Sequence, residues 1–312
     1  MQEKLQRPNY RFEFLIIAII LPFTYGWIEN LFYTAVYSIP HLTLDEIDEL
    51  IANNYYYFDA LFCMVSLLIY VPWFLVLRHR DRRDETREPK PPFKLHHILQ
   101  WTVITLGLSG ISLIWLTLIE DLSAGSELMG LSESLENFNE TWSNTGEEAY
   151  LWTFLSIVLV GPLVEELLFR GLQFWYAEKL RKGWFVLIFT GISFGLWHGE
   201  PVQVVYTAVM GIALAVIYDH TRSFIAPLYI HILNNFISTL PPALDTQTVY
   251  NILDVACLIS IIPTLVMLFL MHRKTQKRRR EARLQISNVA EEVLIESDDG
   301  MIREGSQTST GR

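Results

Sequence analysis

The chain has 312 residues, of which 51% are hydrophobic, and a formal net charge of −10. Its two cysteines, Cys63 and Cys257, both lie inside apolar runs, which excludes a disulfide framework as the basis of the fold. No nucleic-acid partner is expected.

Apolar runs of about twenty residues recur along the chain, and they contain almost no charge. A run of that length spans the hydrocarbon core of a bilayer, and a helix satisfies its own backbone hydrogen bonds there. The sequence therefore predicts an all-α, polytopic membrane helix bundle. The expected spans are eight in number: 12–37, 57–77, 95–119, 149–170, 183–199, 202–218, 224–240 and 251–271.

Lys and Arg alternate sharply between successive connections, and these residues set the orientation of membrane proteins. Residues 38–56, 120–148 and 241–250 contain neither of them. The basic residues gather in the other connections, among them Lys4, Arg7, Arg11, Arg78, Arg80, Arg82, Arg83, Arg87, Lys90, Lys94, Lys179, Arg181, Lys182, Arg222, Arg273, Lys274 and Lys277. With eight spans, all of them fall on one side. We interpret the chain as a multi-pass protein of the bacterial plasma membrane with both termini in the cytoplasm.

Two adjacent carboxylates and an arginine interrupt the fourth apolar run, in the motif Glu165-Glu166-x-x-x-Arg170. Ionisable groups inside a membrane are costly and by default mark function. Glu166 and Arg170 share a helix face and can pair, whereas Glu165 is turned about 100° away. A carboxylate removed from water holds a proton more tightly, which makes Glu165 a candidate general base. The alternative is a cluster at the membrane surface.

A second polar position follows in the fifth run, in Phe194-x-x-x-His198. Gly191, Gly195 and Gly199 recur at every fourth residue beside it. This spacing makes a smooth helix face that lets another backbone approach closely. We therefore expect His198 to lie within reach of another span, although a lone histidine near a span end is more often interfacial.

The third polar site is His231-x-x-x-Asn235 in the seventh run. These two residues share one helix face, and both side chains can donate hydrogen bonds. Together they could hold an anionic oxygen, or His231 could bind a metal. Asn234 points elsewhere and is expected to make a helix contact.

These three motifs, in this order and within spans, resemble the CPBP family of intramembrane proteases. That family includes the CAAX prenyl endopeptidases and the bacterial Abi proteins. The resemblance covers residues 149–245 and implies a protease core there. The remaining divisions are N-terminal spans at 1–120, an external acidic loop at 121–148, a last span at 246–272, and a cytoplasmic tail at 273–312 that is basic and then disordered.

The resemblance implies an endopeptidase that acts on a membrane-associated peptide or protein. Glu165, helped by His198, would activate a water molecule, while His231 and Asn235 stabilise the oxyanion. Glu166 and Arg170 would fix the catalytic helix. The family is often described as metal-dependent, and Glu165, His198 and His231 could hold Zn²⁺. Because the chain has no His-Glu-x-x-His motif, a metal-free glutamate mechanism is favoured.

One geometric requirement follows from the span boundaries. In straight spans, Glu165 and His198 would lie at different depths, given a rise of about 1.5 Å per residue. The two residues meet if the fourth helix continues past Arg170 towards Lys179 and the fifth begins at Trp184.

Two functions of other classes stay open. The chain could be a membrane adaptor or bacteriocin-immunity protein that acts through a partner such as a sensor kinase. It could also be a transporter that uses Glu165 and His198 as a proton relay, although it lacks recognisable inverted repeats.

Overall fold

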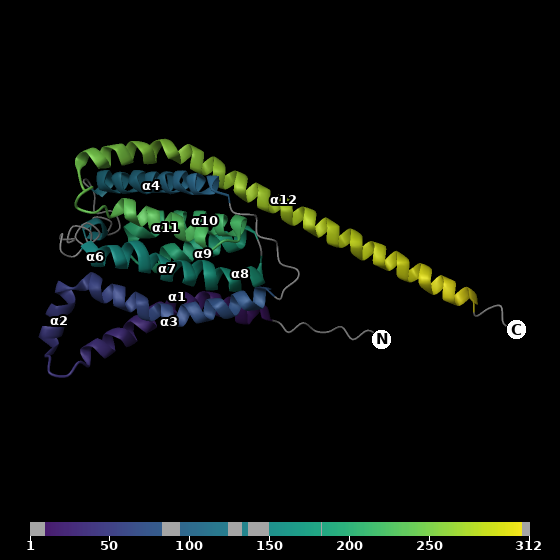
Figure 1. The fold of residues 1–312 in the computed structure, drawn as a ribbon, viewed down its shortest axis with the longest axis horizontal. Coiled ribbons are helices and arrows are strands. Elements are labelled where there is room, and N and C mark those ends of the chain that lie inside the picture. The colour runs from purple at the N-terminus through teal and green to yellow at the C-terminus, as the bar shows by residue number, and fades with distance from the viewer. Residues whose placement is uncertain (1–9, 83–93, 124–132, 137–149, 182, 308–312) are drawn as a thin grey trace. The chain divides into compact units, whose positions relative to one another are not determined.

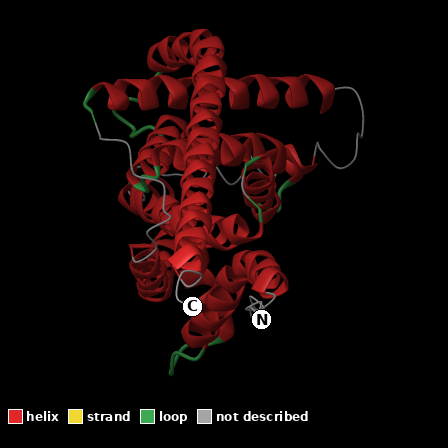
Figure 2. Cartoon of the chain, turned by 90° about the vertical axis from the view of Figure 1, so that its right-hand side faces the viewer, coloured by secondary structure: helices red, strands yellow, loops and turns green. Residues whose placement is uncertain are grey.

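The computed structural model describes residues 10–82, 94–123, 133–136, 150–181 and 183–307. Within these ranges every regular element is a helix, and none is a strand (Figure 2). The predicted fold class, an all-α membrane bundle, is confirmed.

The helices follow the apolar runs closely. In chain order they are α1 (Tyr10–Tyr37), α2 (Leu44–Asn53), α3 (Tyr55–Arg82), α4 (His96–Ser123), α6 (Tyr150–Thr153), η2 (Phe154–Val160), α7 (Gly161–Glu166), η3 (Leu167–Gln173), α8 (Phe174–Leu180), α9 (Trp184–Trp197), α10 (Pro201–Thr221), α11 (Ile225–Ser238) and α12 (Gln247–Gln307). The segments η2 and η3 are wound as π-helix.

The number of spans differs from the expected eight. Within the described ranges, six helical stretches are long and apolar enough to cross a membrane. The fifth and seventh expected spans correspond to α9 and α11, which have 14 residues each. Fourteen residues rise only about 21 Å, less than the roughly 30 Å hydrocarbon core. The count of eight is therefore not confirmed.

The fourth span is one uninterrupted helical stretch that passes through α6, η2, α7, η3 and α8 to Leu180. The next helix, α9, begins at Trp184. These boundaries confirm the geometry that the sequence required, in which the helix carrying Glu165 runs on beyond Arg170.

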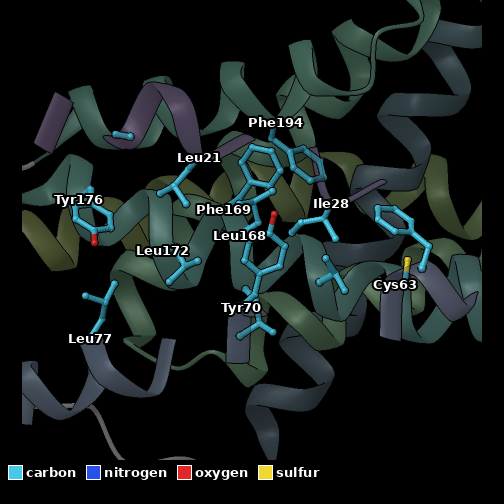
Figure 3. Packing of buried hydrophobic residues seen from close by; sticks show 14 residues of the cluster. Leu21, Ile28, Cys63, Tyr70, Leu77, Leu168, Phe169, Leu172, Tyr176 and Phe194 are labelled. Atoms are coloured by element: carbon cyan, nitrogen blue, oxygen red, sulfur yellow. The ribbon is translucent and has the colours of Figure 1, made fainter. Parts of the chain in front are cut away.

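This stretch is packed on several sides within the body formed by residues 1–268 (Figure 1). Helix α3 lies against η2, η3 and α7, whereas α1 lies against η3 and α8. Helix α11 contacts η2 and α7. Apolar side chains such as Leu21, Tyr70, Leu168 and Phe169 fill the space between them (Figure 3). The motif helix is thus held in the interior of the bundle.

The small-residue face predicted on α9 packs against α10. A Cβ atom at Gly195 would lie 2.6 Å from the carbonyl oxygen of Val204 and 2.6 Å from the Cβ of Ala208. No side chain fits there, so the two backbones approach closely, as the spacing predicted. Gly199 is not part of this contact. Its φ of +78° instead allows the turn that ends α9 just after His198.

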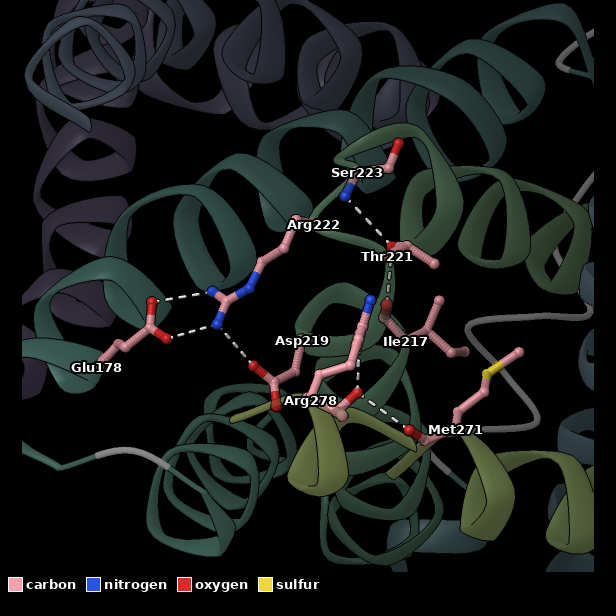
Figure 4. A network of polar contacts seen from close by, with 9 residues as sticks. Glu178, Ile217, Asp219, Thr221, Arg222, Ser223, Met271 and Arg278 are labelled. Carbon is pink, nitrogen blue, oxygen red and sulfur yellow. Dashed lines mark hydrogen bonds and ion pairs between the residues drawn. The ribbon is translucent and has the colours of Figure 1, made fainter. Parts of the chain in front are cut away.

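A group of ion pairs lies at the C-terminal end of α10. Arg222 donates to both carboxylate oxygens of Glu178, at 2.6 and 2.9 Å, and lies 3.0 Å from Asp219 (Figure 4). This fork geometry joins the end of α8 to the turn between α10 and α11. It thereby sets the positions at which α8 and α11 run into the bundle.

Helix α2 was not predicted, because its segment LDEIDELIAN lies in a connection, 38–56, that was interpreted only by its lack of Lys and Arg. Its four acids leave only a narrow apolar face, from which Ile47 packs between Val36 and Phe58. Thr43 caps the helix, and its backbone N–H and hydroxyl group lower the pKa of Glu46.

The last helix also departs from the prediction. A disordered tail was expected, but α12 continues to Gln307. Residues 273–296 are rich in Arg, Glu, Ala and Leu and contain neither Gly nor Pro, a composition that favours helix. Of the expected external loop 121–148, residues 124–132 and 137–149 lie outside the described part of the chain.

Membrane orientation can be tested by cysteine labelling at three positions. We expect Glu49→Cys to react with an impermeant maleimide from outside, and Ser223→Cys and Lys277→Cys to react only after permeabilisation. The native Cys63 and Cys257 are buried and leave the background low. Ser134, in the expected external loop, is only 3% exposed and makes a poor labelling site.

The position that separates eight spans from six is Ser223. If neither α9 nor α11 crossed the membrane, Ser223→Cys would react from outside. Labelling of all three variants from outside would contradict the cytoplasmic placement of the C-terminal side altogether.

Candidate active site

The three motifs meet at one cavity. A hollow of about 560 Å³ is lined by Glu165, His198, His231 and Asn235, which come from α7, the end of α9 and α11. The structure thus brings together residues that are up to 70 positions apart in the chain. Arg170 and Glu166 lie behind this group and are 1% and 0% exposed.

Glu166 contacts a neighbouring side chain through each of its two carboxylate oxygens. Its Oε2 lies 3.2 Å from Arg170 Nε, and its Oε1 accepts a hydrogen bond of 2.8 Å from His231 Nδ1. Arg170 also donates to the carbonyl oxygen of Gly211 at 3.2 Å and stacks over the ring of Phe194, 4.6 Å from its centroid. A buried ion pair needs such additional partners to be tolerated. Glu166 and Arg170 therefore fix the geometry of the site.

Glu165 differs sharply from its neighbour. Its side chain is 16% exposed towards the cavity, and its Oε2 lies 3.7 Å from His231 Nε2. Among the described residues, Oε2 has no hydrogen-bond partner. Oε2 itself is buried, so the 16% exposure comes from the rest of the side chain, which lines the cavity and can reach water there.

The two histidines are held in defined tautomers by what their Nδ1 atoms meet. His198 Nδ1 lies 2.8 Å from the carbonyl oxygen of Phe194, and a carbonyl only accepts, so Nδ1 carries the proton. Its Nε2 then has a free lone pair. His231 likewise donates from Nδ1 to Glu166. Nε2 of His231 can donate only when the ring carries both protons.

The side-chain amide of Asn235 forms a hydrogen bond with the backbone. Its Nδ2 donates to the carbonyl oxygen of Ile157 at 2.9 Å, which uses one of its two N–H groups. The second N–H is the one that could serve an oxyanion. Asn234, as expected, makes a helix contact, since its Oδ1 accepts from Ser109 of α4 at 2.9 Å.

The Ile157 carbonyl is free to bind Asn235 because of the two residues that open the first motif. In the π-wound η2, Gly161 N–H bonds to the carbonyl of Ser156 rather than to that of Ile157. Pro162 follows and has no N–H. A Cβ at position 161 would lie 2.5 Å from Ser156 O, so only glycine fits. Gly161 and Pro162 lie just before Glu165 in the chain, but neither was predicted to have a role in the site.

The alternative to a metal-free site is a metal site formed by Glu165, His198 and His231. Among residues 10–307, leaving aside those not described, no group of three or more His, Cys, Asp or Glu side chains is arranged to hold a metal ion. The Nδ1 contacts of His231 with Glu166 and of His198 with the Phe194 carbonyl leave Nε2 of each ring as the atom that could bind a metal.

Known proteins match the segment that carries the motifs. Residues 147–237 match the family described as "Type II CAAX prenyl endopeptidase Rce1-like". A stretch of 77 residues is 26% identical to the "Putative membrane peptidase YdiL" of Bacillus subtilis (strain 168), covering 25% of this chain and 32% of that protein. The match thus spans about a third of the relative's length.

No solved structure matches the chain. The family match includes Glu165, Glu166, Arg170, His198, His231 and Asn235, which are the residues gathered at or behind the cavity. Residues 147–237 are thus similar to a family of membrane proteases, in agreement with the resemblance that the three motifs carry.

Proposed function

We propose that the chain is an intramembrane endopeptidase that hydrolyses a peptide bond of a membrane-associated protein or peptide. One observation carries the proposal: the two adjacent glutamates differ in their burial and in their contacts. Glu166 is 0% exposed and lies 2.8 Å from His231 Nδ1 and 3.2 Å from Arg170 Nε, whereas Glu165 lines the cavity, is 16% exposed and lies 3.7 Å from His231 Nε2. This division of labour suits one structural and one reactive carboxylate.

In this mechanism Glu165 and His198 activate water together. Glu165 accepts the water proton while the lone pair on His198 Nε2 orients the oxygen for attack on the scissile carbonyl. The proton then passes from Glu165 to the leaving amine. The Phe194 carbonyl keeps His198 in the tautomer that this step needs.

His231 and Asn235 donate hydrogen bonds to the oxyanion that forms. His231 donates from Nε2 in its doubly protonated form, between the two glutamates. Asn235 donates through the N–H that Ile157 leaves free. A preorganised donor of this kind contributes roughly 3–4 kcal/mol to the transition state.

The cavity adjoins a second, largely apolar hollow that opens between α1 and α9. It measures about 790 Å³ and includes Ile19, Phe23, Ile192 and Leu196 among its lining side chains. Tyr25 lines both hollows. This arrangement favours a substrate that reaches Glu165 from the bilayer with an apolar segment in the outer hollow.

Metal dependence separates the two mechanisms that use these side chains. We expect activity to survive a membrane-permeant chelator, because the proposed steps use only Glu165, His198, His231 and Asn235. The measurement is cleavage before and after chelation, with elemental analysis of the purified protein. Loss of activity on chelation and its recovery with Zn²⁺ would instead make Glu165, His198 and His231 ligands.

The proposal as a whole is tested by mass spectrometry of membrane peptides from cells that carry the wild-type protein or Glu165→Gln. We expect a defined set of new peptide termini that appears only with the wild type. Identical peptide sets would favour the adaptor or immunity function, in which the fold acts through a partner. Proton-coupled uptake abolished by Glu165→Gln, with identical peptide sets, would favour the transporter.

A further inference from the structure

Asp59 is an acidic residue that none of the three motifs contains. It lies in α3, within the candidate span Tyr55–Asp81, and outside the family segment 147–237. It nevertheless lines the same cavity as Glu165 and His198. An ionisable group in a span is costly and calls for a functional reason.

The contact that Asp59 makes points to that reason. Its Oδ2 accepts a hydrogen bond from the hydroxyl group of Ser156. Ser156 belongs to η2, the π-wound turn that leads into the catalytic α7. Short π-wound segments are uncommon, are less stable than α-helix and occur frequently at functional sites. A charge-assisted bond from a neighbouring helix stabilises such a turn.

The next residue of the turn is held by a second helix, α11. The carbonyl oxygen of Ile157 accepts the hydrogen bond from Asn235 of α11, and η2 packs between α3 and α11. Asp59 and Asn235 therefore form hydrogen bonds with consecutive residues of η2. The position of one contact constrains the other, because residues 156 and 157 are joined by a rigid peptide unit.

We infer that Asp59 is a positioning residue, which acts through Ser156 and η2 to place the Ile157 carbonyl and, with it, the amide of Asn235. The N-terminal spans thereby take part in shaping the site that the C-terminal motifs form. The effect on catalysis rests on the proposed function, whereas the effect on η2 does not.

The test measures the turn and the chemistry separately in purified full-length protein. Hydrogen–deuterium exchange followed over residues 154–161 reports η2, including the Gly161 amide that bonds to Ser156 O. We expect Asp59→Ala and Ser156→Ala each to speed this exchange about tenfold or more, the scale of one lost charge-assisted hydrogen bond. Both variants should lower kcat about tenfold on a cleaved peptide and leave KM unchanged, since only donor placement is altered.

Conservative and control variants separate positioning from other roles. Asp59→Asn keeps an acceptor oxygen for Ser156 without the charge, so its exchange and kcat should lie between those of Asp59→Ala and the wild type. Ser66→Ala removes a buried hydroxyl from the same helix whose oxygen has no described hydrogen-bond partner, and it should change neither readout. Glu165→Gln should abolish cleavage without changing exchange in η2.

Two results would overturn the inference. Exchange over 154–161 that is unchanged in both Asp59→Ala and Ser156→Ala would show that Asp59 does not hold the turn. A loss of kcat in Asp59→Asn as large as in Asp59→Ala would make its charge, not its hydrogen bond, the operative property. If the wild type cleaves no peptide, the proposed function fails, and the exchange measurement alone still decides the role of Asp59.

Discussion

Replacing Glu165 with glutamine should lower kcat by roughly 10²–10⁴, the range that a general base contributes. Gln has the same shape but cannot accept the proton of the attacking water. The fold should be unaffected, because Oε2 of Glu165 has no described hydrogen-bond partner to lose. The measurement is the pair kcat and kcat/KM on a cleaved peptide, together with the midpoint of thermal unfolding in detergent.

Glu29→Gln is the matched control for this change. Glu29 lies in the apolar span α1 and lines the outer hollow rather than the cavity of Glu165. Its replacement removes the same charge from a membrane helix and should leave kcat unchanged. Wild-type kcat in Glu165→Gln would show that another group activates the water.

Arg170→Ala should produce the largest loss of stability. It leaves Glu166 buried, 0% exposed, with an uncompensated charge, and breaking such a pair costs roughly 3–5 kcal/mol. The double variant Glu166→Gln/Arg170→Met should regain part of this loss, because it removes both charges together. Thermal or denaturant unfolding in a fixed detergent measures the three proteins side by side.

The control is the exposed pair of Lys277 and Glu281, 3.8 Å apart with side chains 78% and 58% exposed. Lys277→Ala should change the free energy of unfolding by no more than about 1 kcal/mol. A midpoint for Arg170→Ala equal to that of the wild type would mean that Glu166 takes up a proton at little cost or gains water.

Much of the site was predictable because its chemistry is concentrated in short motifs. Polar residues in apolar runs stand out, and the i,i+4 spacing placed Glu166 with Arg170 and turned Glu165 away from both. The structure has that arrangement. The glycine spacing of α9 also predicted its close approach to α10.

The π-wound turns were not predictable from the same patterns. Residues 154–160 form an apolar run that fits α-helix and π-helix equally well, and only the pair Gly161-Pro162 hints at the irregular hydrogen bonding. Asp59 was missed because it lies about 100 residues before the motifs and has no local partner. Its meaning depends on the tertiary contact with Ser156.

The predicted helix boundaries were wrong where a helix is amphipathic or charged and not apolar. Helix α2 was overlooked because four of its ten residues are acidic and it is too short to span a membrane. The helical extension of α12 was overlooked because a polar composition was equated with disorder. The span count depends on α9 and α11, which have 14 residues each and are therefore short for a span; α9 is a short apolar helix.

The central claim is that Glu165 directs water to a peptide bond inside the membrane. It is tested most directly by reconstituting the purified protein in liposomes with a cleaved substrate in H₂¹⁸O. The account predicts that each newly formed carboxyl terminus carries one ¹⁸O atom from the solvent, and that the product is absent with Glu165→Gln. Product formed equally by the wild type and Glu165→Gln, or new termini without ¹⁸O, would contradict it.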